Sequence, residues 1–141
     1  MTDETSQAAG RMTLEELQER GERIRKYFHD RLGVELAYDR ATVEWLDGFI
    51  GRNRHLVTDD LLYVWSLALG YILGESVRRT IGGEWEWCDE FREWGVDLGD
   101  GVGLMNPIGK VWKFLRSPED SVLSFYEVAA MAKERGWDNI G

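Results

Sequence analysis

The stretch Thr58–Gly83, TDDLLYVWSLALGYILGESVRRTIGG, decides the fold of this chain. It contains no charged side chain between Leu61 and Gly74. An apolar run of this length is too short to span a bilayer and too long for an ordinary strand. We therefore predict a helix that is buried on most sides, and we call it the central helix.

Two glycines within the central helix indicate close packing. Gly70 and Gly74 lie four residues apart, and each costs a helix about 1 kcal/mol relative to alanine. We expect another backbone to cross the helix closely at this face. The alternatives are relief of crowding beside Trp65 and Tyr71, a ligand that approaches the bare backbone, and a homodimer with the glycines at the subunit contact.

Glu75 is the first charged residue after the apolar run, at a position where we expect deep burial. A buried carboxylate needs a partner or has a raised pKa. Its functional interpretation is a general acid or base, or one half of a binding site. Its structural interpretation is a pair with Arg78 or Arg79, with Lys110, or with the indole N–H of a tryptophan. Buried ion pairs are commoner than catalytic carboxylates, so we favour the structural interpretation.

The sequence before the central helix predicts two amphipathic helices. Thr13 and Glu16 have the spacing of a capping box, and Gly33 is a typical C-terminal stop. Residues 34–38 alternate apolar and polar side chains and could form a strand or an extended linker. Asp39 can cap the second helix.

The sequence after the central helix predicts a small antiparallel sheet. Residues 84–88, EWEWC, alternate strictly, which places both tryptophans on one side of a strand and both glutamates on the other. Residues 96–98 and 102–105 are shorter extended pieces, and the GDG at 99–101 has the composition of a turn. The tryptophans could form a stacking platform for a ligand, but an aromatic stripe of this kind is more often part of a core.

Two further helices follow the predicted sheet. Asn106 is a typical N-cap and Pro107 a typical first helical residue. The Ser-Pro pair at 117–118 predicts the start of the last helix in the same manner, and Gly136 predicts its end. We expect Trp137 to fold back onto the body of the protein.

Composition limits the class of protein. With 141 residues, seven tryptophans, five tyrosines and five phenylalanines, the chain can bury one core. We predict an α+β fold, with residues 1–11 as a flexible N-terminal tail and residues 12–141 as a single domain. In it the buried central helix and the other helices pack against a small antiparallel sheet.

Charge and the lack of targeting signals narrow the expected partners. The formal net charge of −9 argues against nucleic-acid binding and favours a protein partner, which could be basic. Residues 1–11 lack the apolar core of a signal peptide, and we see no segment that would cross a membrane. We therefore expect a cytoplasmic protein.

No motif for catalysis, cofactor binding or metal binding is found in the sequence. His29 and His55 lie in separate polar segments, and the single cysteine, Cys88, has no ligand-like spacing to them. The glycines of GDGVG at 99–103 match neither a dinucleotide fingerprint nor a P-loop. We therefore expect no cofactor, no metal and no catalytic residue.

Three segments together resemble a family of small bacterial proteins of unknown function. They are VEWLDGFIGRNR at 43–54, LALGYILGESVRRTIGGEW at 67–85 and NPIGKVWKFL at 106–115. The resemblance implies an α+β fold and a bacterial cytoplasmic protein, and it supplies no catalytic residue. The matching positions are Gly70, Gly74, Glu75, Trp85, Pro107 and Lys110. Since Glu75 and Lys110 belong to one pattern, the resemblance also suggests that they pair.

Our leading hypothesis is a non-catalytic domain that binds another protein. In one version it is an immunity or antitoxin-like protein whose acidic face masks a basic toxin surface. The alternative is a small-molecule or enzymatic site lined by Glu75, Trp85 and Lys110, with Gly70, Gly74 and Pro107 in structural roles. That alternative predicts a concave pocket in which solvent reaches the carboxylate of Glu75.

Overall fold

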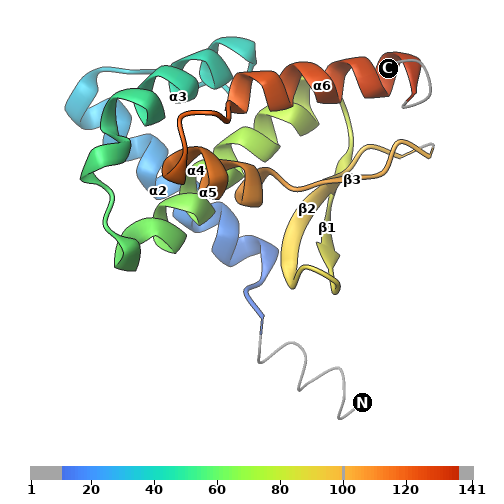
Figure 1. Ribbon diagram of the computed structural model, residues 1–141, viewed down its shortest axis with the longest axis horizontal. Helices are drawn as coiled ribbons and strands as arrows, with labels where there is room; N and C mark the ends of the chain where they lie inside the picture. Colours follow the sequence, from blue (N-terminus) through green and yellow to red (C-terminus); the bar gives the residue numbers. More distant parts are fainter. Residues whose placement is uncertain (1–10, 100, 137–141) are drawn as a thin grey trace.

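The structure, a computed structural model, describes residues 11–99 and 101–136, and these form helices and one sheet (Figure 1). The three strands are antiparallel, in the order β1-β2-β3, so the predicted α+β class is confirmed. Residues 1–10 of the expected tail, Asp100 of the expected turn and Trp137 lie outside the described residues. The elements in chain order are α2 (Leu14–Leu32), α3 (Arg40–Asn53), the single turn η1 (Arg54–Leu56), α4 (Asp59–Thr80), β1 (Glu84–Cys88), β2 (Glu93–Asp97), β3 (Leu104–Met105), α5 (Pro107–Arg116) and α6 (Val122–Arg135).

The first two helices begin at the predicted caps. At the start of α2, Glu16 N–H donates to the hydroxyl of Thr13 over 3.1 Å, and Thr13 N–H donates to the Glu16 carboxylate over 2.9 Å. Gly33 ends α2 in the left-handed conformation, with φ of 67°. Asp39 caps α3, and residues 34–38 form a linker without strand pairing.

Helix α4 is the predicted central helix, but only part of it is buried. Every residue from Ser66 to Val77 is buried, because α2 and α5 pack against this part of the helix. The expectation of burial from Leu61 onward is wrong for the first turns. Leu61, Tyr63 and Val64 are 43%, 53% and 48% exposed.

Both glycines of α4 allow close contact within the chain, as predicted. A Cβ atom at Gly70 would lie 2.7 Å from the Cα atom of Ile108 in α5. A Cβ atom at Gly74 would lie 2.3 Å from the Trp85 ring and 2.9 Å from Pro107. The hypothesis of a homodimer through these glycines is therefore wrong, because the chain's own α5 and β1 occupy that face.

Helix α5 begins as predicted, and α6 begins later than predicted. Asn106 accepts a hydrogen bond from Gly109 N–H, with Pro107 as the first residue of α5. The cap of α6 is Ser121 and not Ser117, because the Ser121 hydroxyl both accepts from Ser124 N–H and donates to Asp47 of α3. The segment that precedes it is a turn, and α6 ends at the predicted Gly136.

The small sheet lies beside the helices (Figure 1), and its residues Val96 and Met105 belong to the hydrophobic core. Trp85 of β1 is paired with Val96 of β2, which is paired in turn with Met105 of β3. The sheet contacts α4 and α5 through β2, and it also contacts α4 through Trp85 of β1. Among the described residues, no helix is both long enough and apolar enough to cross a membrane.

Candidate functional site

The Glu75 carboxylate is the best-connected polar group of the buried part of α4. Although Glu75 is only 3% exposed, both of its oxygens accept hydrogen bonds. Arg78 binds it with two nitrogens, over 2.9 Å to Oε1 and 2.7 Å to Oε2. Arg79 Nε donates to Oε2 over 2.7 Å, and the Trp85 indole donates to Oε1 over 3.0 Å. The predicted pairing of Glu75 with an arginine and with an indole N–H is confirmed.

These contacts keep Glu75 ionised. Burial raises the pKa of a carboxyl group, but the hydrogen bonds from Arg78, Trp85 and Arg79 outweigh burial and lower the pKa of Glu75 to about 2. The two guanidinium groups are partly solvated, with side chains 34% and 47% exposed. The carboxylate is therefore a poor proton acceptor near neutral pH, which argues against a role as a general base.

Trp85 joins the strand β1 to α4. Its ring fits over the bare backbone of Gly74 and stacks on Tyr71, with ring centroids 5.5 Å apart and an angle of 7° between the planes. Tyr71 in turn lies against Gly21 of α2, where a Cβ atom would come within 2.3 Å of its ring. The tryptophan therefore packs in the core on one side and satisfies its N–H with Glu75 on the other.

A cavity of about 280 Å³ lies over this cluster. Its lining residues are Leu14, Gln18, Tyr71, Glu75, Arg78, Arg79, Glu84 and Trp85. The cavity includes two residues of the predicted ligand site, but the predicted pairing of Glu75 with Lys110 is wrong. Lys110 donates to Asp120 over 2.5 Å, and this hydrogen bond lowers the pKa of Asp120. Lys110 thus ties α5 to the turn before α6.

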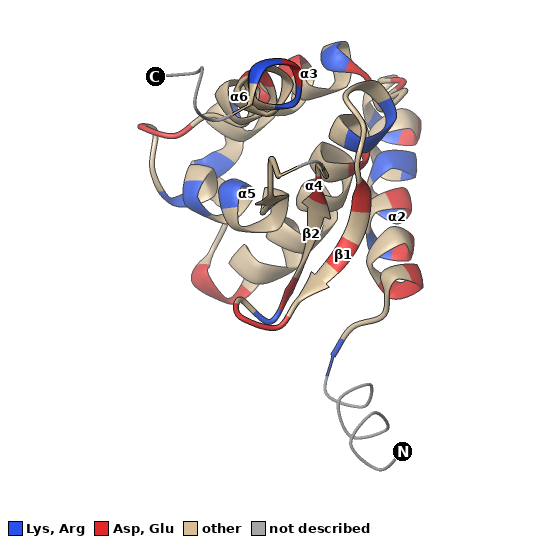
Figure 2. Cartoon of the chain, turned by 90° about the vertical axis from the view of Figure 1, so that its right-hand side faces the viewer, with Lys and Arg blue, Asp and Glu red and all other residues tan. Residues whose placement is uncertain are grey.

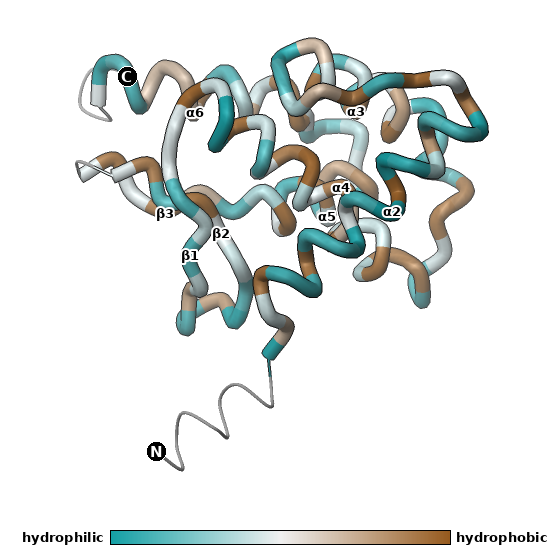
Figure 3. Tube along the Cα trace, turned by 180° about the vertical axis from the view of Figure 1, so that it is seen from behind, coloured by the Kyte–Doolittle hydropathy of each residue, from teal (hydrophilic) through white to brown (hydrophobic). Residues whose placement is uncertain are grey.

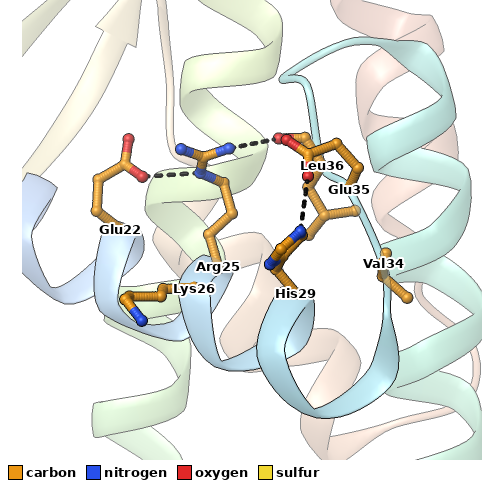
Figure 4. Close-up of a pocket in the computed structure, with 7 residues that line it drawn as sticks. All are labelled: Glu22, Arg25, Lys26, His29, Val34, Glu35 and Leu36. Carbon is orange, nitrogen blue, oxygen red and sulfur yellow. Dashed lines mark hydrogen bonds and ion pairs between the residues drawn. The ribbon is translucent and has the colours of Figure 1, made fainter.

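A second cavity, of about 510 Å³, lies at the C-terminal half of α2 (Figure 4). The side chains of Arg25 and His29 point toward the segment that follows the helix. Arg25 donates to Glu22 and to the carbonyl oxygen of Leu36, and His29 lies 3.4 Å from Glu35. Since acidic and basic groups are paired across this cavity, it has no clear preference for ligands of one charge.

Tyr38 lies beside one arginine from each of these two cavities, and sequence analysis did not identify it. Its ring lies between two guanidinium groups, 5.0 Å from Arg25 and 4.4 Å from Arg79. Its hydroxyl donates to Glu22 over 2.8 Å, and the residue has φ of 60°. Burial, followed by the hydrogen bond to Glu22, raises the pKa of Tyr38 above its ordinary value. A single tyrosine in a linker carries no sequence signal for this position.

Two cavities with mostly apolar linings adjoin Trp65 in the N-terminal half of α4. Figure 3 shows the hydropathy of the residues along the trace of α2 and α4. We call the surface around Trp65 that includes both cavities the Trp65 face. On one side of Trp65 lies a cavity of about 320 Å³, between α2 and α4. It is lined by Arg20, Arg23, Ile24, Tyr27, Val64, Trp65 and Ala68. On its other side lies a cavity of about 120 Å³, lined by Phe49, Ile50, Asn53, Leu56, Val57, Trp65, Leu69 and Leu115.

Acidic side chains also lie on β1 and on α2. Figure 2 shows acidic positions along β1 and both signs of charge along α2. Glu84 and Glu86 are exposed on β1, as the alternation predicted, while Trp85 and Trp87 are partly buried on the other side. A hydrogen bond with Asp97, together with the charge of Asp97, raises the pKa of Glu86.

The described residues offer no metal centre, and comparisons with known proteins give no match. Within residues 11–99 and 101–136, no three His, Cys, Asp or Glu side chains are placed to hold a metal ion. No family model matches the chain. Searches of curated proteins and of solved structures found no match. The resemblance to a family of small bacterial proteins therefore stays a prediction.

Proposed function

We propose that this chain is a non-catalytic module that binds protein, and that it binds through the Trp65 face. The observation that carries the proposal is that none of the five consecutive apolar residues at 61–65, LLYVW, is buried: Leu61, Tyr63 and Val64 are exposed, and the other two are partly buried. Contiguous exposed apolar surface of this kind usually marks an interaction site. Residues 61–65 belong to the same helix, α4, as the buried residues 66–77, so a well-anchored helix presents this apolar surface.

The charges at the Trp65 face indicate what the partner carries. The larger cavity is lined by two arginines, Arg20 and Arg23, and by no carboxylate. Arg23 binds Glu19 over 2.7 Å, but both side chains are about 70% exposed, so this pair is weak. A segment with apolar side chains and a neighbouring carboxylate would fill the cavity and pair with the arginines.

The alternative, a small-molecule or enzymatic site around Glu75, Trp85 and Lys110, has weaker support. It required a Glu75 carboxylate that solvent can reach, whereas the side chain is 4% exposed and accepts four hydrogen bonds. Lys110 is engaged with Asp120. The cavity above Glu75 remains the place where such a ligand would bind.

Site-specific photo-crosslinking in the native host tests the proposal. A photoreactive residue at position 64 should give a discrete protein adduct, because Val64 is 48% exposed at the centre of the Trp65 face. The matched control is position 86, where Glu86 is exposed on the acidic strand β1. Adducts at position 86 alone would overturn the choice of face and favour the immunity or antitoxin-like version, in which acidic residues contact a basic partner. Adducts at neither position would overturn protein binding.

A further inference from the structure

We propose that the partner bound at the Trp65 face is a second copy of this chain, in a two-fold symmetric dimer. The inference rests on the proposed function, because it names the occupant of the same face. A symmetric contact requires that one surface carry both halves of each interaction. The Trp65 face must then present carboxylates as well as arginines.

The start of α4 supplies those carboxylates. Asp60, Val64 and Ala68 lie four residues apart, as do Leu61 and Trp65, so the five residues lie along one side of the helix. Asp60 is exposed at the end of this stripe, where its carboxylate accepts a hydrogen bond from Thr58. The segment DDLL at 59–62 therefore has the chemistry that the cavity requires, namely apolar side chains beside an acid.

The register follows from symmetry. If the N-terminal halves of α4 from two copies pack antiparallel about Val64, Asp60 of one copy lies opposite Ala68 of the other, since both are four residues from Val64. Ala68 is only 7% exposed, but it lines the same cavity as Arg20 and Arg23. Each Asp60 thus approaches the two arginines of the other copy, and the symmetry makes this contact twice.

The apolar groups agree with the same arrangement. The two Val64 side chains meet at the axis, and Leu61 of each copy packs beside the stripe of the other. This covers residues that are 43% and 48% exposed in the single chain. The contact places opposite charges together locally, although each chain carries a formal charge of −9. The glycine face of α4 takes no part.

Sedimentation equilibrium over a concentration series tests this dimer. The wild-type chain should form a dimer. Val64→Glu places two carboxylates at the axis, so it should weaken the dimer by about 100-fold or more. The matched control is Leu32→Glu, which adds the same charge at an apolar residue that is 53% exposed near the end of α2, and it should leave the dimer unchanged. Circular dichroism should show that both variants keep the fold.

Charge reversal gives the sharper experiment. Asp60→Arg alone and the double variant R20E/R23E should each be monomeric, because each places like charges together. A mixture of the two should form a heterodimer, because the introduced arginine of one chain meets the introduced glutamates of the other, while the wild-type contacts remain on the opposite side of the axis. A mixture that stays monomeric would overturn the proposed register.

Failure of this inference can be told apart from failure of the proposed function. A wild-type chain that is monomeric at about 100 µM, together with crosslinks from position 64 to a different protein, would overturn the dimer and leave protein binding at the Trp65 face in place. A monomer without crosslinks at position 64 would overturn both. Crosslinks from position 64 to the chain itself, lost in Val64→Glu backgrounds, support both.

Discussion

Replacement of Glu75 by glutamine tests the most connected part of the structure. The substitution keeps the size of the side chain and removes its charge, so two arginines and one indole lose a charged acceptor. The amide nitrogen of the glutamine also brings a donor to a place where only donors converge. Breaking a buried pair by neutralising one partner typically costs about 3–5 kcal/mol.

The pKa of Glu75 gives a second, independent value for the stability that its charge contributes. The folded-state value of about 2 lies below the ordinary value of 4.5. At about 1.4 kcal/mol per pKa unit, ionisation of Glu75 stabilises the folded state by about 3 kcal/mol. Because the folded pKa is the lower one, this contribution is present above about pH 4.5 and is lost as the pH falls toward 2. We therefore expect E75Q to lower the free energy of unfolding by about 3 kcal/mol at pH 7.

Urea unfolding at pH 7 and near pH 2.5 measures both the loss of stability in E75Q and its dependence on pH. The difference between wild type and E75Q should shrink strongly at the lower pH, and the melting temperature at pH 7 should fall by about 10 °C. The matched control is Glu19→Gln, which breaks an exposed i,i+4 pair and should cost less than about 1 kcal/mol. A loss below about 0.5 kcal/mol for E75Q at pH 7 would show that the cluster does not stabilise the fold.

Three further predictions concern packing, pH dependence and capping. Gly70→Ala should lower the free energy of unfolding in denaturant by about 1–3 kcal/mol, since the added methyl meets the Ile108 backbone. Gly51 has open space around it, so Gly51→Ala should stabilise α3 by up to about 1 kcal/mol. Burial raises the pKa of Glu93 to about 7, so the protonated acid stabilises the fold below about pH 4.5. This contribution is lost as the pH rises through about 7. E93Q should therefore raise the free energy of unfolding at pH 8 by about 1–2 kcal/mol and leave it unchanged at about pH 4. Ser121→Ala should cost about 1–2 kcal/mol in thermal unfolding, because it removes both the cap of α6 and the contact with α3.

The parts of the fold that were predictable depend on local signals. The capping box at Thr13, the proline at the start of α5 and the alternation in β1 each act within a few residues, and each is confirmed. Two glycines at helical spacing were likewise sufficient to predict close packing. The partners of Glu75 could be narrowed because Arg78 and Arg79 lie one turn away.

The parts that were missed depend on tertiary contacts. The exposure of 61–65 could not be read from an apolar run, because burial of the run depends on how far α2 and α5 extend along it. Lys110 binds Asp120 because α5 ends in a tight turn, which a resemblance between short patterns does not encode. Ser121 became the cap in place of Ser117 because Asp47, 74 positions earlier in the chain, accepts a hydrogen bond from the Ser121 hydroxyl.

The separation in sequence of these contacts has a consequence for the order of folding. Arg78, Arg79 and Trp85 all lie within ten positions of Glu75, so the corner between α4 and β1 closes a short loop. Loops of about 10 residues close in about 10–100 ns. The link between Ser121 and Asp47 spans far more chain and must wait for slower searches. We expect the α4–β1 corner to form early in refolding and the docking of α6 on α3 to form last.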